Sequence, residues 1–327
     1  MVIHIIMYHY VRNNDDFEYN VFCRGKKEFE DQVQFLNKNL YHCPLTNKEE
    51  IDYFLKSDEE SFVLTFDDGY KEHLDCARYL NKIGINGIFF PSHNIFQNQF
   101  LDANLIHLII GSRKSNIGNL IEQIQYYIDT YGIEIKSVLF NYFGKSIDEY
   151  INSVKPKRGQ SIEISAIKFL LQRDLNGKHN RKKILYELFK KYYKKNQDYY
   201  FKNFYLNISD MYEMQELGSK FGSHGITHKH FDSLSKSDQQ NEIRQSIENF
   251  IDLKLIGKED LKMVCYPYGS YNTETIKIMI RNKIDLGFIT VPKGARLNSK
   301  DTLYTLPRWD TNHWWDKTSG KPIFPLK

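Results

Sequence analysis

The chain has 327 residues, of which 41% are hydrophobic and 26% charged, and its formal net charge at pH 7 is +4. This length is enough for one large α/β barrel or two ordinary domains, and the composition is that of a soluble globular protein. So small a net charge gives no indication of nucleic-acid binding.

Apolar runs and helical periodicity alternate along much of the chain. The predicted strands cover residues 2–8, 62–66, 86–91, 220–223, 262–266 and 286–291. The predicted helices cover 29–40, 47–55, 70–83, 117–131, 162–171, 178–195, 243–251 and 273–280. Strands that alternate with helices are typical of a parallel α/β fold.

This alternation is interrupted at about 101–210, where helical patterns dominate. We interpret the stretch as a helical insertion over the mouth of a barrel, which would select the substrate and exclude water. A packing or dimerisation subdomain is an equal alternative. Within it, the segment 178–195 carries eight basic residues beside an apolar side. A solvated helix face is the first interpretation of that segment, and attraction of an anionic substrate carrier is the second.

Cysteine usage and the first residues bear on the cellular compartment. The four cysteines are scattered without a CxxC pair, which argues against a zinc–thiolate site or a disulfide framework. The N-terminal residues lack the basic flank, long apolar region and cleavage site of a signal peptide. No stretch has the apolar length of a membrane span, so we expect a cytoplasmic protein.

Two adjacent acids end the predicted strand 62–66. Asp67 and Asp68 stand where parallel α/β folds place their active sites, and Gly69 follows them. Neighbouring side chains on a strand or tight turn point in different directions, so one carboxylate can bind a metal while the other faces a reacting water. A solvated Asp-Gly turn is the alternative.

Two histidines, His224 and His228, lie four residues apart in a later segment. If a helical turn follows His224, both rings lie on one face and can bind one divalent ion. Two imidazoles and one carboxylate leave open positions on a metal, as hydrolytic sites require.

Three motifs together resemble those of the polysaccharide deacetylases, the family with the NodB homology domain. They are Thr65-Phe66-Asp67-Asp68-Gly69, His224-Gly225-Ile226-Thr227-His228 and Cys265-Tyr266-Pro267-Tyr268-Gly269. The match extends from an opening Tyr8-His9 to Leu306-Pro307-Arg308, and so covers most of the chain. The resemblance implies a distorted (β/α) barrel as a single domain over residues 1–327, with a helical insertion, that hydrolyses the N-acetyl group of an amino sugar.

Roles follow from the resemblance residue by residue. It makes Asp68, His224 and His228 the ligands of a divalent metal, with zinc as the first choice. It makes Asp67 the base that activates the attacking water, and the backbone amide of Tyr268 the donor to the developing oxyanion.

The chain departs from the family pattern at two places. Cys265 stands where the third motif usually has an arginine that orients the catalytic acid, and Arg308 is our candidate for the missing cation. The usual C-terminal motif with a histidine general acid is also absent. His9, in the branch with an N-terminal Tyr-His motif, is the first candidate for that acid, and His313 among three tryptophans is the second.

The sequence therefore predicts a metal-dependent deacetylase of an N-acetylated sugar or glycan, used in surface-polysaccharide biosynthesis. Another amide or ester hydrolase on the same fold, such as a sugar deformylase, is the alternative among enzymes. A carbohydrate-binding protein without turnover is the alternative from another class, although such a protein would need no open metal site.

Overall fold

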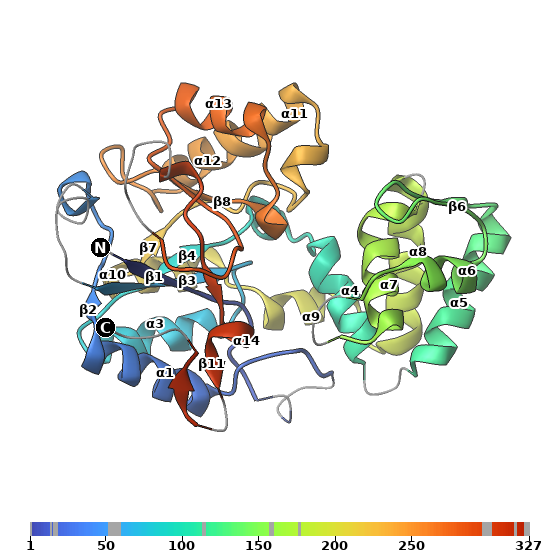
Figure 1. Cartoon of the computed structure of the whole chain (residues 1–327), viewed down its shortest axis with the longest axis horizontal. Helices are drawn as coiled ribbons and strands as arrows, with labels where there is room; N and C mark the ends of the chain where they lie inside the picture. The colour runs from blue at the N-terminus through green and yellow to red at the C-terminus, as the bar shows by residue number, and fades with distance from the viewer. Residues whose placement is uncertain are drawn as a thin grey trace. The chain divides into compact units, whose positions relative to one another are not determined.

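A computed structural model describes residues 2–13, 15, 19–51, 60–112, 116–156, 160–175, 178–295, 303–316 and 319–323. Contacts divide the chain into two compact units (Figure 1). The first comprises Met1–Asn13, Cys23–Gln99 and Phe201–Lys327, and the second comprises Asn14–Phe22 and Phe100–Tyr200. That residues 1–327 form a single domain stays a prediction. So does the position of a helical insertion, at about 101–210, over the mouth of a barrel.

A parallel sheet runs through the first unit. Its strands follow the order β10 (Trp309–Asp310), β1 (Ile3–Tyr8), β3 (Ser61–Asp67), β4 (Ile88–Phe90) and β7 (Lys220–Phe221), and β2 (Tyr41–His42) pairs with the start of β3. Every residue of β1 and β3 is buried. Such continuous apolar strands are typical of parallel sheets that are covered on both faces.

Two further strands extend this arrangement. β8 (Met263–Cys265) and β9 (Leu286–Phe288) form a parallel pair. A parallel bridge joins Ser223, just after β7, to Val264, and another joins Phe288 to Leu306, shortly before β10. Through these bridges the pairing runs from β1 round to the segment that pairs with β1 again. The predicted α/β class with a parallel sheet is confirmed.

Helices connect and cover these strands. In Figure 1 α1 and α3 lie below the sheet and α12 and α13 above it. The helices are α1 (Lys26–Asn39), α3 (His73–Lys82), η2 (His93–Gln97), α10 (Ile208–Glu216), η4 (Phe231–Ser233), α11 (Lys236–Gln240), the π-helix η5 (Asn241–Gln245), α12 (Ser246–Asp252), η6 (Pro267–Gly269), α13 (Thr273–Arg281) and α14 (Thr311–Trp314). The predicted helix at 47–55 lies mostly outside the described residues.

The second unit is mainly helical. Its helices are α4 (Asp102–Gly111), α5 (Ile117–Tyr131), α6 (Ile147–Ser153), α7 (Ile162–Phe169), the π-helix η3 (Leu170–Asp174), α8 (Lys178–Tyr192) and the first half of α9 (Gln197–Phe204). It also contains an antiparallel hairpin, β5 (Ile135–Ser137) and β6 (Tyr142–Gly144), which the sequence analysis missed. Strands of three residues are too short to give a period-two pattern. No helix among the described residues combines the length and apolarity needed to cross a bilayer.

Candidate active site

The two acids stand at the carboxyl end of β3 and diverge there. Asp67 is the last residue of the strand, while Asp68 has φ 74° and Gly69 has φ 77°. A side chain at position 69 would meet Pro91, since its Cβ would lie 2.8 Å from the Cβ of that proline. The tight turn therefore requires glycine at this position. This turn directs the carboxylates of Asp68 and Asp67 toward different partners, as the sequence analysis predicted.

Asp68 faces both histidines of the second motif. Its Oδ1 lies 3.5 Å from His224 Nε2 and 3.1 Å from His228 Nε2. The other oxygen, Oδ2, accepts a hydrogen bond of 2.5 Å from the Tyr70 hydroxyl. All four side chains are buried. The three predicted metal ligands are thus brought together, and Tyr70 orients the carboxylate among them.

The protonation states suit a metal. His224 Nδ1 lies 2.8 Å from the Cys265 carbonyl oxygen, which can only accept, so the proton is on Nδ1 and the Nε2 lone pair faces Asp68. Burial lowers the pKa of His224 to about 4. Burial alone would raise the pKa of Asp68, but His228 together with His9 and His224 holds that pKa well below its usual value. A neutral imidazole beside an ionised carboxylate is a metal-binding donor set.

The pKa of His228 is shifted in the opposite direction to that of His224. Burial lowers the pKa of His228, but the neighbouring Asp68 carboxylate outweighs burial and the net pKa is raised. A bound dication would take the place of that proton, because metal binding releases protons from ligands.

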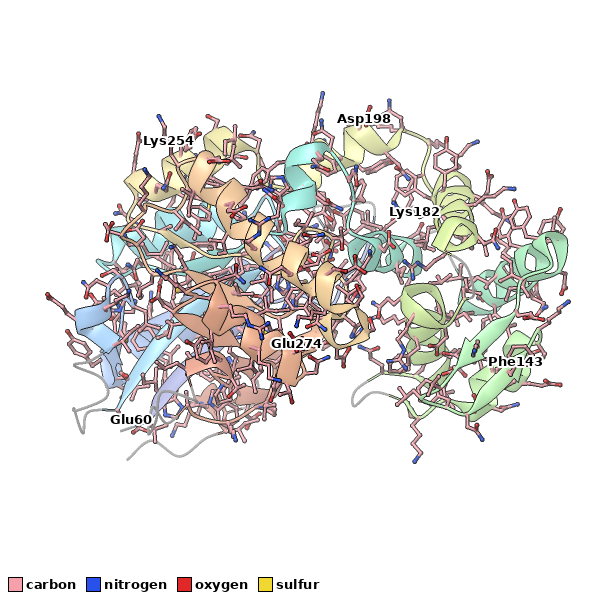
Figure 2. The ribbon with its side chains drawn as sticks, turned by 90° about the horizontal axis from the view of Figure 1, so that it is seen from above. Glu60, Phe143, Lys182, Asp198, Lys254 and Glu274 are labelled. Carbon is pink, nitrogen blue, oxygen red and sulfur yellow. The ribbon has the colours of Figure 1, made fainter. Side chains whose placement is uncertain are left out.

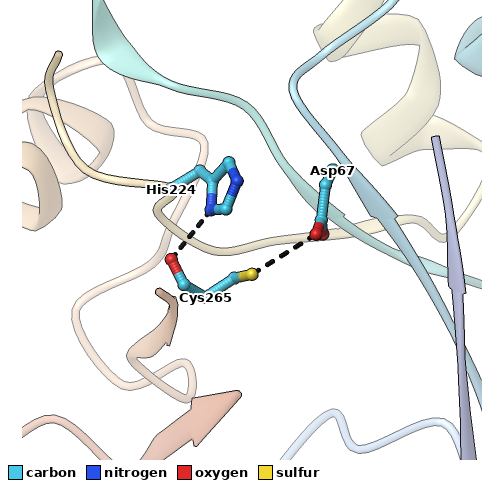
Figure 3. A group of neighbouring side chains, drawn as sticks. All are labelled: Asp67, His224 and Cys265. Atoms are coloured by element: carbon cyan, nitrogen blue, oxygen red, sulfur yellow. Dashed lines mark hydrogen bonds between the residues drawn. The ribbon is translucent and has the colours of Figure 1, made fainter. Parts of the chain in front are cut away.

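Among the described residues, two groups of side chains have donor atoms within 4.8 Å of one another, and both include His224. One is Asp68, His224 and His228; the other is Asp67, His224 and Cys265, shown in Figure 3. The second fits a metal poorly. Asp67 is already paired with a guanidinium, as described below, and burial raises the pKa of the Cys265 thiol, which therefore stays neutral. The first group is the candidate metal site.

The loop between the histidines is not the helical turn that the sequence analysis considered. Gly225 has φ 73° and His228 has φ 56°, so the chain turns irregularly and still directs both rings to Asp68. A buried carboxylate holds this loop. Glu242 accepts hydrogen bonds from the backbone N–H groups of Ile226 (2.7 Å) and Thr227 (2.9 Å), and from the Thr227 hydroxyl. Nothing in the sequence marks Glu242, which lies in the π-helix η5.

Asp67 forms a buried two-pronged ion pair with Arg308. Arg308 donates from Nη1 to Oδ1 (2.8 Å) and from Nη2 to Oδ2 (2.6 Å). The Cys265 thiol lies 2.9 Å from Nη2 and 3.4 Å from the carboxylate, so it borders the pair on one side. Burial would raise the pKa of Asp67, but Arg308, with smaller contributions from His224 and His9, lowers that pKa to about 2. The cation that the resemblance places at position 265 is supplied here from position 308.

The candidate acids are placed differently by the structure. His9 follows β1, and its Nε2 lies 3.9 Å from Asp67 Oδ2 with 37% of the side chain exposed. Its backbone carbonyl accepts a hydrogen bond of 2.9 Å from His73 Nε2, which fixes the chain at this point. His313 belongs to α14, but its side chain lies outside the described part of the structure.

Tyr268 borders the candidate metal site. It has φ 60°, within η6, and its ring lies edge-on to His228 with the ring centroids 4.8 Å apart. The His230 ring stacks on the Tyr268 ring, with 4.0 Å between the ring centroids. The role of its backbone amide stays a prediction, as do the roles of the other site residues.

Comparison with known proteins finds matches among polysaccharide deacetylases. Residues 176–287 match the family model described as polysaccharide deacetylase, a segment that includes both histidines and the Tyr-Pro-Tyr-Gly motif. A stretch of 105 residues is 30% identical to YxkH of Bacillus subtilis (strain 168), which carries the name of a polysaccharide deacetylase. The matched stretch covers 32% of this chain and 36% of that protein, about a third of its length.

Solved structures of deacetylases share the fold of nearly the whole chain. The Streptococcus pyogenes deacetylase PplD, solved in complex with acetate, has a TM-score of 0.54 at 16% identity and covers 95% of this chain and 92% of its own. IcaB from Ammonifex degensii has a TM-score of 0.51 at 13% identity and covers 98% and 94%. At these identities the likeness establishes the fold. The resemblance to the polysaccharide deacetylases is therefore confirmed, and the fold class is theirs.

Proposed function

We propose that the chain is a metal-dependent hydrolase that removes the N-acetyl group from an amino sugar or glycan. The single observation that carries the proposal is the convergence of His224 and His228 on one oxygen of Asp68, beside a second, ionised carboxylate. Asp68, His224 and His228 would hold the metal, and two imidazoles with one carboxylate favour zinc. A divalent ion held there would polarise the substrate's amide carbonyl and lower the pKa of water.

The remaining residues of the site supply positioning and proton transfer. Arg308 keeps Asp67 ionised and fixes the direction of its carboxylate, which then accepts the proton of the attacking water. His9 Nε2 lies 3.9 Å from Oδ2 of that carboxylate, and His9 donates a proton to the departing amine. The backbone N–H of Tyr268 stabilises negative charge on the carbonyl oxygen.

The names of the structural neighbours support an acetyl group as the one removed. They are deacetylases, and acetate, which is bound to one of them, is the second product of the proposed reaction. A role in surface-polysaccharide biosynthesis and a cytoplasmic location complete the proposal. An anionic carrier for the substrate is a further part of it, based on the basic helix α8.

The contacts of α8 limit how much of its charge is available for a carrier. Lys183 lies over the Tyr131 ring at 3.9 Å and Lys190 over Tyr186 at 5.2 Å. Arg181 pairs with Asp102 at 3.2 Å. Activity on an anionic carrier should fall steeply with salt while activity on a small neutral N-acetyl sugar changes little. Equal salt dependence for both substrates would support the other interpretation of α8, in which its basic residues form a solvated helix face.

Metal analysis combined with acetate release from a panel of N-acetyl sugars tests the proposal. Asp68→Ala should lose metal and activity together, because it removes a ligand. Asp67→Asn should retain metal and lose turnover, because it removes only the proton acceptor. Loss of metal in Asp67→Asn as complete as in Asp68→Ala would contradict these roles. Formate release from N-formyl sugars would indicate the deformylase alternative, and sugar binding without turnover would indicate a binding protein.

A further inference from the structure

The hairpin β5–β6 in the second unit presents an apolar tip to solvent. Val138 is 87% exposed, Leu139 56% and Phe143 67%. Scattered exposed apolar side chains are normal on protein surfaces. These three belong to one short hairpin, in which Val138 and Leu139 lie in the turn and Phe143 in the strand that follows it. Figure 2 shows Phe143 on this hairpin.

The opposite side of the hairpin is firmly attached to the second unit. The Phe140 ring packs on Phe169 with 5.0 Å between ring centroids. The Tyr142 ring packs on Tyr150 at 5.6 Å, and its hydroxyl donates to the Ser146 carbonyl at 2.8 Å. Ile135 and Ser137 are buried. The alternation of a strand then directs Lys136, Val138 and Phe143 outward, so their exposure belongs to an ordered element.

Lysines border the apolar tip. Lys136 is exposed and lies directly opposite Phe143 in the hairpin register, and Lys145, also exposed, follows β6. Two acids lie near the hairpin: Glu134 directly precedes β5, and Glu149 accepts a hydrogen bond from the Tyr142 hydroxyl at 3.3 Å. The second unit as a whole is also basic. Residues 14–22 and 100–200 contain 17 Lys and Arg against 13 Asp and Glu, a net charge of +4.

We infer that this hairpin docks on an anionic lipid surface. Its three apolar side chains would enter the boundary between headgroups and acyl chains, and Lys136 and Lys145 would lie at the level of the anionic headgroups. A protein partner fits less well. Stable protein interfaces cover about 800 Å² on each side and are depleted of lysine, whereas three side chains at a narrow tip offer far less area. The inference concerns residues other than those of the candidate active site and does not depend on the proposed activity.

Co-sedimentation of the full-length protein with vesicles tests this inference. The vesicles are phosphatidylcholine alone or phosphatidylcholine mixed with phosphatidylglycerol. We expect binding to the mixed vesicles and much weaker binding to the neutral ones. The triple variant Val138→Ser, Leu139→Ser, Phe143→Ser should reduce binding to background. Lys136→Gln combined with Lys145→Gln should weaken it roughly 30-fold, since each lysine near an anionic surface contributes about fivefold.

A matched pair of lysines separates a docking site from general attraction. Lys190 and Lys191 on α8 are exposed, and their double replacement by glutamine removes the same charge. That variant should lose no more than a fewfold in binding. Equal losses in the two lysine pairs would overturn the inference, as would a wild-type protein that binds neither vesicle. If the triple variant instead changed the oligomeric state and left vesicle binding intact, the tip would be a contact between copies of the chain.

Discussion

Replacement of Arg308 by methionine would leave the Asp67 carboxylate buried without its guanidinium. Both side chains are almost fully shielded from solvent, at 0% and 2% exposure, and the two hydrogen bonds between them are 2.8 and 2.6 Å long. Methionine fills much of the same volume, so the change tests charge pairing more than packing. The Cys265 thiol beside this carboxylate is neutral and cannot replace the guanidinium, and His9 Nε2 lies farther away, at 3.9 Å from Oδ2.

The size of the effect follows from the pKa of Asp67. Burial acts to raise this pKa, but Arg308, with smaller contributions from His224 and His9, lowers it to about 2 in the folded chain. Relative to an ordinary carboxyl near 4, that depression corresponds to about 2–3 kcal/mol of stability at neutral pH. Removal of one partner of a buried ion pair costs about 3–5 kcal/mol, because the other charge loses its compensation. We therefore expect Arg308→Met to reduce the free energy of unfolding by about 3–5 kcal/mol.

Urea unfolding across a range of pH measures this loss. Since the folded pKa of Asp67 is depressed, the stabilisation is present above the ordinary pKa of about 4 and is lost as pH falls toward 2. The difference between wild type and variant should thus be largest near neutral pH and shrink on acidification. Arg78→Met is a suitable control, because Arg78 makes an exposed ion pair with Glu213 and should cost about 1 kcal/mol at most.

Two results would refute this reasoning. One is an Arg308→Met protein that unfolds at the same urea concentration as the Arg78→Met control. The other is a stability difference that does not change between neutral and acidic pH, which would indicate lost packing and not lost charge pairing. The double variant Asp67→Asn, Arg308→Met should be more stable than Arg308→Met alone, because it no longer buries an unpaired charge.

Two further predictions concern the same site. His9→Ala should retain metal and fold but lower turnover roughly 10²–10⁴-fold, measured by acetate release, because it removes a proton donor. Near-normal turnover of His9→Ala, together with an inactive His313→Ala, would instead make His313 the general acid. Glu242→Ala should weaken metal affinity roughly 10–100-fold in a chelator competition, because the loop that carries the two histidines loses the carboxylate that holds it. The control variant Glu248→Ala, at an exposed position, should retain wild-type affinity. An equal loss of affinity in the control would contradict the explanation.

The sequence predicted the elements that carry the site and several of its contacts. The apolar run before Asp67 and Asp68 became β3, and their divergence follows from the geometry of a strand end. The candidate cation Arg308 was identified because the third motif lacks one, and it lies on Asp67 in the structure. Motifs of this kind are local in sequence, so their residues can be recognised without knowledge of the fold.

Other parts of the site could not be predicted from the chain alone. The second-motif histidines meet Asp68 through an irregular loop, where positive φ at Gly225 and His228 replaces a helical turn. The support from Glu242 depends on how η5 packs against that loop, and a glutamate in a helix gives no sign of such a contact. Tyr70 likewise bonds Asp68 only because the turn at Gly69 brings it back. These contacts arise from tertiary packing and have no local signature.

The ring of strand pairings has a consequence for how the protein can be made. In β1, Ile6 lies opposite Leu64 on one side and Trp309 on the other, so the first strand acquires its second neighbour only when the last part of the chain is present. During synthesis one edge of this apolar strand stays open, and open edges promote aggregation. The Asp67 carboxylate likewise gains its Arg308 partner only when this late part of the chain has been synthesised. Fragments that end before β10 should therefore aggregate, which makes internal insertions a safer route to engineered forms than C-terminal truncation.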